Sequence, residues 1–224
     1  MLRIQDFTFN FFQEHSYVVW DESLTCVIVD PGCESSKEKA ELWDFIAGEG
    51  LKPAMVLLTH AHLDHIFGVK DTLEKYGIKA MMDPCEAEIV EKFNGVYSRF
   101  GLRKPDSFPF EPLSDGQTLH FGNTDIKVIS TPGHSPGGVC FYIEKERVIF
   151  TGDTLFAGSV GRTDNDFASL DSLMSSLRDR LMLLDGDTDV LPGHGPGTSI
   201  ARERTTNPFI YEDFSAEEIF RQEQ

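Results

Sequence analysis

The chain has 224 residues, of which 40% are hydrophobic and 11% aromatic, so it can fill a substantial core. Its 20 basic and 37 acidic residues give a formal net charge of -17, which disfavours nucleic acid and membrane as partners. The N-terminus has no leader pattern, no apolar run approaches the roughly 20 residues that span a bilayer, and the four cysteines show no CxxC spacing. We therefore expect a cytoplasmic protein with reduced thiols.

The first part of the chain predicts strands and helices in alternation. Ser35 and Glu38 form the Ser-x-x-Glu pattern of a capping box, which predicts the start of an amphipathic helix. The spacing of apolar residues indicates strands over 2–12, 16–20 and 25–29, a helix from Ser35 to Gly48, a strand over 54–58, a helix from Asp64 to Tyr76 and a strand over 79–82.

Residues 84–116 differ in character from the segments on either side. An amphipathic helix through Ile89 and Phe93 is followed by a stretch that is rich in proline and phenylalanine. We interpret this stretch as a connector or a lid, and we expect Phe108 and Phe110 to pack under a loop as part of the core.

The second part of the chain again predicts strands followed by helices. Strands are indicated over 117–121, 125–130, 138–143, 147–150 and 189–191, with a helix after Ser169 and two helices from Ile200 onward. The two parts have a similar make-up, so we expect one α/β domain over 1–224 whose halves join near 84–116. Two sheets packed face to face, with helices outside, would accommodate this order because each helix must cover a group of strands.

Several apolar runs end in small or turn residues and then in a side chain that can bind a metal. These side chains are His60, His134, Asp153 and His194, and Asp30 follows a run in the same way. Loops at one edge of a layered fold can converge on a single point. We therefore expect Asp30 to form a turn or to support a ligand near that point. Two histidines lie away from these positions: His15, which we expect at a strand edge, and His120, which we expect on the surface.

The segment from Thr59 to His65 holds three imidazoles and a carboxylate within six residues. His60 and His62 lie two apart in an extended segment and can bind one metal ion together, whereas Asp64 and His65 can face a second ion. The candidate ligands number seven, which is too many for one four-coordinate ion and suits two sites that share a carboxylate: His60, His62, Asp64, His65, His134, Asp153 and His194.

We take Asp153 as the shared ligand, because a carboxylate readily bridges two cations and a neutral imidazole does not. Imidazole and carboxylate ligands without thiolate suit two divalent ions, Zn first and Fe or Mn as alternatives. Such a pair lowers the pKa of a bridging water from about 15.7 toward neutrality and gives a hydroxide that attacks a polarised carbonyl. Catalytic roles are assigned to Asp64 and Asp153.

Another hydrolase mechanism has one formal match in the sequence. The segment Gly133 to Gly137 fits the Gly-x-Ser-x-Gly pattern of a serine nucleophile. That elbow needs a turn from a strand into a helix and an N–H after the serine, whereas Pro136 has no N–H and a strand is predicted to follow. A metal-dependent mechanism is therefore preferred, and no Gly-x-x-x-x-Gly-Lys phosphate loop is present.

With these motifs the sequence resembles the metallo-β-lactamase superfamily, whose signature is Thr-His-x-His-x-Asp-His followed by separate His, Asp and His positions. The resemblance runs from about Asp30 to Pro208. It implies the four-layer αβ/βα sandwich with two mixed β-sheets flanked by helices. It also implies that His60, His62 and His134 bind one metal, that Asp64, His65 and His194 bind the other, and that Asp153 lies between them.

Within this superfamily the chain is most similar to short bacterial glyoxalase II, the hydroxyacylglutathione hydrolase. The similarity rests on Gly152 to Phe156, Gly161 to Asp164 and Asn207 to Phe209. It implies hydrolysis of a small thioester, S-(2-hydroxyacyl)glutathione first, to a hydroxy acid and a free thiol. Longer members bind glutathione through basic residues of a helical extension, and the basic residues after His194 here are three: Arg202, Arg204 and Arg221.

Two alternatives in function remain beside the thioester hydrolase. The persulfide dioxygenase branch has similar motifs but uses one iron held by two His and one Asp, and a non-catalytic metal-binding protein is the other alternative in function. The commonest class of true β-lactamases has Cys at the position of Asp153, which argues against that activity.

The role of Arg162 has two interpretations. Its side chain could anchor a substrate carboxylate, or it could pair with Asp164 or Asp166.

Overall fold

The computed structural model describes residues 1–92 and 107–211. Its first half forms a mixed sheet in the spatial order β1-β2-β3-β4-β5-β6, in which β1 to β3 pair antiparallel and β3 to β6 pair parallel. The strands are β1 (Arg3–Phe9), β2 (Glu14–Trp20), β3 (Thr25–Val29), β4 (Lys52–Leu57), β5 (Lys79–Met82) and β6 (Phe110–Pro112).

The second half forms another mixed sheet, in the order β14-β13-β10-β9-β8-β7, with β10 and β13 parallel and the other neighbours antiparallel. A two-stranded hairpin of β11 and β12 lies apart from it. The strands are β7 (Thr118–Phe121), β8 (Thr124–Ser130), β9 (Val139–Ile143), β10 (Val148–Gly152), β11 (Leu155–Phe156), β12 (Ser159–Val160), β13 (Asp189–Pro192) and β14 (Thr198–Ser199).

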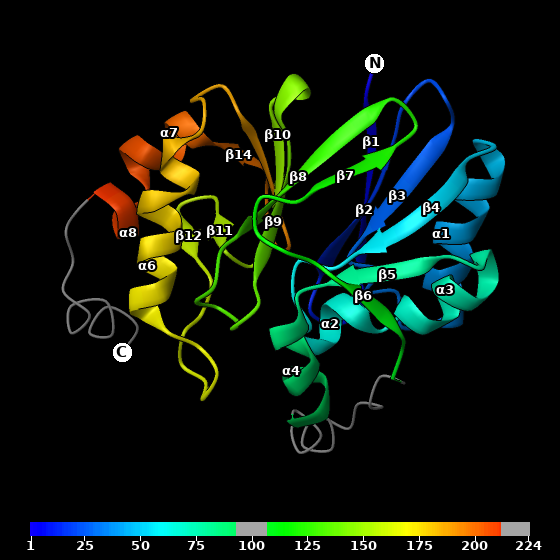
Figure 1. Cartoon of the computed structure of the whole chain (residues 1–224), viewed down its shortest axis with the longest axis horizontal. Coiled ribbons are helices and arrows are strands. Elements are labelled where there is room, and N and C mark those ends of the chain that lie inside the picture. The colour runs from blue at the N-terminus through cyan, green and yellow to red at the C-terminus, as the bar shows by residue number, and fades with distance from the viewer. Residues whose placement is uncertain (93–106, 212–224) are drawn as a thin grey trace.

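Helices cover the outer face of each sheet, so the molecule has four layers (Figure 1). On the first sheet lie α1 (Ser36–Gly48), α2 (Leu63–Ile66), α3 (Val69–Tyr76) and α4 (Ala87–Lys92). On the second lie α6 (Leu170–Asp179), α7 (Ile200–Thr206) and α8 (Pro208–Tyr211), at the left of Figure 1. These features confirm the predicted fold of two mixed sheets flanked by helices.

Successive side chains along a strand point to opposite faces of its sheet, so each sheet contributes to two layers of the core. In β3, Cys26 and Ile28 point into the core beneath α1 and α3, whereas Val27 and Val29 point into the core between the sheets. In β9, Phe141 faces the same central core, and Cys140 and Tyr142 face the core beneath α6. Each of these strands is buried on both sides, which explains why they are continuous apolar runs in the sequence.

Most predicted elements are present, and the differences have local causes. The strand predicted over 2–12 ends at Phe9, because Asn10 adopts a left-handed backbone conformation with φ 51°. The helix predicted over 64–76 is broken at Gly68, whose backbone lies so close to Cys33 that a Cβ atom would be 2.2 Å from the Cys33 sulfur. The strands β6, β11, β12 and β14 were not predicted, since they have only two or three residues each.

Part of the predicted connector, with Phe93, lies outside the described residues. Phe108 and Phe110 are described, and both pack against the core beneath α1 and α3 as expected. The four cysteines lie in the described ranges and are free thiols. Among the helices that the structure describes, none combines the length and the apolar character needed to cross a membrane.

Candidate metal centre

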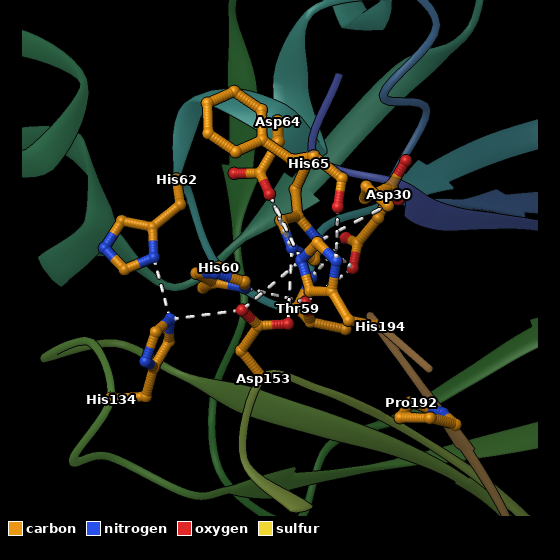
Figure 2. A network of polar contacts seen from close by, with 12 residues as sticks. Asp30, Thr59, His60, His62, Asp64, His65, His134, Asp153, Pro192 and His194 are labelled. Atoms are coloured by element: carbon orange, nitrogen blue, oxygen red, sulfur yellow. Dashed lines mark hydrogen bonds and ion pairs between the residues drawn. The ribbon is translucent and has the colours of Figure 1, made fainter. Parts of the chain in front are cut away.

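The ends of five strands meet at one edge of the two sheets and bring together all seven side chains that the sequence predicts as ligands (Figure 2). His60 follows β4, His134 follows β8, Asp153 follows β10 and His194 follows β13, while Asp30 follows β3. The remaining predicted side chains lie at the beginning of α2: His62, Asp64 and His65. Strands of two different sheets therefore build one site.

The first group consists of His60, His62 and His134, each of which has a ring nitrogen within 4.8 Å of those of the others. His62 and His134 come from different halves of the chain and approach each other most closely, with 2.8 Å between His62 Nδ1 and His134 Nε2. Figure 2 shows these two rings facing each other beside Asp153. The group contains three imidazoles and no carboxylate.

The second group consists of Asp64, His65 and His194, whose ligand atoms also lie within 4.8 Å of one another. Nε2 of His194 is 3.2 Å from Oδ2 of Asp64. Both Asp64 and His65 are fixed by the first turn of α2, which places them on the side of the segment away from His62. This group combines two imidazoles with one carboxylate.

Asp153 lies between the two groups. Its Oδ2 is 3.5 Å from His134 Nε2 of the first group and 3.6 Å from His194 Nε2 of the second. Its Oδ1 is 3.4 Å from His65 Nε2. Gly193 allows this approach, since a Cβ atom there would be 2.4 Å from the Asp153 carboxylate. The position is the one that a carboxylate shared by two ions would need.

Hydrogen bonds from Nδ1 to oxygen atoms orient four of the five histidines of the site, whereas Nδ1 of His62 contacts Nε2 of His134. His134 Nδ1 donates to the Arg162 carbonyl at 2.8 Å, His194 Nδ1 to the Phe12 carbonyl at 3.1 Å and His65 Nδ1 to Asp30 at 3.0 Å. His60 Nδ1 donates to the Thr59 hydroxyl at 3.0 Å, because that hydroxyl itself donates to Asp30. Since these oxygens act as acceptors, Nδ1 carries a proton in each of the four rings, and Nε2 is the nitrogen that faces the site.

The donor atoms fit divalent cations. Nε2 of His60, Nε2 of His65 and Oδ1 of Asp153 are buried and have no hydrogen-bond partner among the residues that the structure describes. A buried polar atom without a partner costs about 1–3 kcal/mol, and a cation that accepts its lone pair removes this cost. Nitrogen and oxygen donors without thiolate suit Zn, and they would also bind Fe or Mn.

The two groups differ in their electrostatics. Burial lowers the pKa of His60 well below its ordinary value, and burial together with His134 lowers the pKa of His62 to about 3. Burial also disfavours a charged His65, but the Asp153 and Asp64 carboxylates outweigh it and raise the pKa of His65 well above the ordinary value. In the first group, His60 and His62 therefore favour the neutral form, whereas the carboxylates of the second group favour a protonated His65.

Asp30 supports both groups, as its position at the end of a strand suggested. Its two oxygens accept hydrogen bonds from the Thr59 N–H at 2.7 Å, the Thr59 hydroxyl at 2.5 Å and His65 Nδ1 at 3.0 Å. It also falls within 4.8 Å of ring nitrogens of His60 and His65. Because its oxygens already accept these hydrogen bonds, we interpret Asp30 as a residue that orients ligands.

Other predicted residues have different surroundings. The Arg162 side chain is 80% exposed and forms two hydrogen bonds with Asp164, at 3.0 and 2.8 Å, while its carbonyl orients His134. His15 lies in β2 and His120 is exposed beside Asp125, as expected. Ser135 is 1% exposed in this structure, and the strand β9 follows it, so a serine elbow is not formed.

Sequence reasoning missed three groups that hold the site together. The Asn10 side chain donates to the carbonyls of Asp64, at 2.9 Å, and Gly32, at 3.0 Å, and the Phe12 carbonyl accepts from His194. Glu86 is buried against the loops that carry the first group. A signal existed for Glu86, which follows the apolar run 80–82 within a turn in the same way that Asp153 follows its own run.

Known proteins resemble the chain over nearly its whole length. The model of the metallo-beta-lactamase superfamily matches residues 9–194. The hydroxyacylglutathione hydrolase GloC of Haemophilus influenzae is 32% identical over 202 residues, which cover 89% of this chain and 93% of that protein.

Two crystal structures are also similar. The BLEG-1 B3 metallo-beta-lactamase is 33% identical, with a TM-score of 0.86 over 94% of this chain and all of that one. TTHA1623 in a di-iron-bound form is 38% identical, with a TM-score of 0.81 over 92% of this chain and 99% of that one. The chain therefore belongs to the metallo-β-lactamase superfamily of metallohydrolases.

Proposed function

We propose that the protein is a two-metal hydrolase of small thioesters, with S-(2-hydroxyacyl)glutathione as its preferred substrate. The observation that carries this proposal is the position of Asp153, which lies within 3.6 Å of ligand atoms from both three-residue groups. The similarity to GloC supports the substrate class, because the alignment covers most of both chains.

The residues fit a reaction in which water attacks a carbonyl. Bound divalent ions would polarise the carbonyl and lower the pKa of water toward neutrality. His60, His62 and His134 would hold one ion, and Asp64, His65 and His194 the other, with Asp153 as the shared ligand. Although burial opposes the charge of Asp64, His65 and His194 lower its pKa, so this carboxylate can also accept a hydrogen bond from the attacking water.

The surroundings of the site suit a substrate with an apolar part. The Phe156 ring lies 6.2 Å from the His194 ring, and the adjacent turn between β1 and β2 exposes 85% of Phe11 beside Phe12. A thioester offers apolar methylene and sulfur atoms next to a polar carbonyl. We expect the acyl end to reach the ligands and the thiol end to lie along these aromatic rings.

Hydrolysis of a β-lactam amide is the second candidate, and the BLEG-1 structure is the specific observation that favours it. The sequence argument against lactamase activity concerned the class with Cys at the position of Asp153, so it does not apply to every lactamase. A persulfide dioxygenase with a single iron remains the alternative among the non-hydrolases.

One panel of assays separates these candidates. The purified protein would be tested with S-lactoylglutathione, other thioesters, a lactone, a cephalosporin and glutathione persulfide, with oxygen uptake recorded for the last. We expect thioester hydrolysis with kcat/KM of about 10⁴ M⁻¹s⁻¹ or more, as is usual for an enzyme with its own substrate. Faster cleavage of the cephalosporin would favour the lactamase, and oxygen uptake by a protein with one iron would replace the hydrolase.

A further inference from the structure

Glu86 is a buried carboxylate that connects two loops of the metal centre. Its side chain is 0% exposed, and each of its oxygens accepts one backbone N–H. Oε2 accepts from Ala61 and Oε1 from Gly137, both at 2.7 Å. Burial raises the pKa of Glu86, and these two N–H groups and the Ser135 hydroxyl oppose that effect. A buried acceptor pair of this kind fixes the distance between the groups that donate to it.

The two loops are those that carry the first group of candidate ligands. Ala61 stands between His60 and His62, and Gly137 follows His134 by three residues in a short loop. Neither hydrogen bond of Glu86 goes to Asp64, His65 or His194. The hydrogen bonds of Glu86 therefore act on the first group, whereas Asn10 contacts the Asp64 carbonyl of the second group and Asp30 contacts both groups through Thr59 and His65.

The local structure is built around this contact. Glu86 ends a 3₁₀ turn, Pro84–Glu86, directly after β5, and Asp83 caps the turn by accepting from the Cys85 N–H at 2.8 Å. Gly137 allows the loop to approach this turn, because a Cβ atom there would lie 2.8 Å from the Asp83 carboxylate and 3.0 Å from Glu86 Cγ. The turn and the glycine thus hold the carboxylate between the loops.

We propose that Glu86 is a positioning residue that sets the geometry of the His60, His62 and His134 group by joining the loops that carry it. The inference rests on the proposed metal centre and assigns Glu86 no contact with substrate. Residues that orient metal ligands in this way typically contribute about 10–100-fold to metal affinity. The effect should be confined to one of the two ions.

Glu86→Gln tests the proposal with little change of shape. The amide keeps one oxygen that accepts an N–H, but its NH₂ group faces the other backbone N–H, so two donors oppose each other and one loop is released. Glu88→Gln is the matched control, because it removes the same charge two residues along the chain from an exposed side chain. Circular dichroism and thermal unfolding would establish that both variants are folded.

Metal affinity is the measurement. Metal-free protein would be titrated with Co²⁺ in competition with a chelator, with the visible spectrum of the bound Co²⁺ recorded, and His134→Ala and His194→Ala would identify which binding step belongs to which group. For Glu86→Gln we expect the step that is lost in His134→Ala to weaken about 10–100-fold, with the other step unchanged. Glu88→Gln should match the unsubstituted protein.

Unchanged affinity at both steps in Glu86→Gln, or an equal loss at both, would overturn the proposal, since the second result indicates a general structural role. The test is independent of the proposed function. If the unsubstituted protein binds a single ion, the proposal of a two-metal hydrolase is wrong. The inference about Glu86 is still tested, because it requires that the binding step missing in His134→Ala be weaker in Glu86→Gln. If no Co²⁺ binds, both fail.

Discussion

The two ligand groups are equal in size but differ in charge and in support. The first group has three imidazoles, and burial lowers the pKa values of His60 and His62. The second has a carboxylate and two imidazoles, and the carboxylates of the site raise the pKa values of His65 and His194 against the effect of burial. Glu86 supports the first group, while Asp30 touches both through Thr59 and His65.

The two groups of one site thus prepare their ligands for a cation in two different ways. In the first group, burial favours the neutral form of His60 and His62, so these two rings can bind a cation without loss of a proton. In the second group, negative charge attracts a cation but also attracts protons that compete with it. Asp153 is the residue in which the two environments meet, and substitutions there should have the largest effect.

Asp153→Ala should remove most of the activity, because it removes the carboxylate that lies between the two groups, within 3.6 Å of ligand atoms of each. We expect kcat/KM to fall by more than about 100-fold, beyond the usual effect of losing a supporting residue. Hydrolysis of S-lactoylglutathione would be measured beside an exposed control on α1, Asp44→Ala, and circular dichroism would establish the fold. Full activity in folded Asp153→Ala would exclude a shared role for this carboxylate.

Asp30→Asn should weaken both groups, in contrast to Glu86→Gln. Asparagine tolerates the left-handed backbone of this position, where φ is 47°, but it loses one of the two carboxylate oxygens that hold Thr59 and His65. We expect each metal affinity to fall about 10–100-fold, measured by chelator competition. A loss at one step alone would show that Asp30 serves a single group.

Metal affinity should depend on pH in the second group and much less in the first. The raised pKa values of His65 and His194 keep these rings protonated at pH values above 6.5, the ordinary pKa of histidine. A cation must then displace a proton, so the metal affinity of this group rises with pH. Each displaced proton corresponds to about a tenfold rise per pH unit. His60 and His62 are already neutral in this range, because their pKa values are lowered.

This contrast can be measured with variants that each retain one group. Zn²⁺ titration of His134→Ala, which keeps the second group, should give a dissociation constant that falls as pH rises from 6.5. His194→Ala, which keeps the first group, should show a smaller change with pH, because His60 and His62 are already neutral. Equal slopes in the two variants would contradict the assigned difference in protonation.

Arg162→Ala should have the smallest effect. Its exposed guanidinium pairs with Asp164, and such surface pairs contribute about 0–1 kcal/mol, so thermal stability should hardly change. Because alanine keeps the carbonyl that orients His134, we expect kcat to be unchanged. If the side chain anchors a substrate carboxylate, KM for glutathione thioesters should rise up to about tenfold, with no rise for a thioester that lacks a carboxylate.

The sequence predicted the fold and the gathering of seven side chains because both follow from strand ends. A short apolar run such as 54–58, which follows a proline, favours a buried strand beside others like it, and the residues after such strands meet at one edge. The short strands β11 and β12 could not be predicted, since they depend on tertiary contacts such as the bond from Asn207 to the Ser159 carbonyl.

Supporting residues were harder to predict than candidate ligands. Glu86 and Asn10 act through backbone groups of distant loops, and a backbone N–H or carbonyl leaves no trace in the sequence. Asp30 was found because it ends a strand, although the sequence did not indicate that it would reach His65. The pKa contrast between the groups likewise needs the distances, since all five histidines have the same side chain.

In the proposed two-metal hydrolase, Asp153 binds both ions. The most direct test of this proposal is the rate of S-lactoylglutathione hydrolysis as Zn²⁺ is added stepwise to metal-free protein. We expect kcat to rise until two equivalents are bound per chain and then to stay constant. Full activity with one equivalent, or no thioester hydrolysis with two equivalents bound, would contradict the proposal.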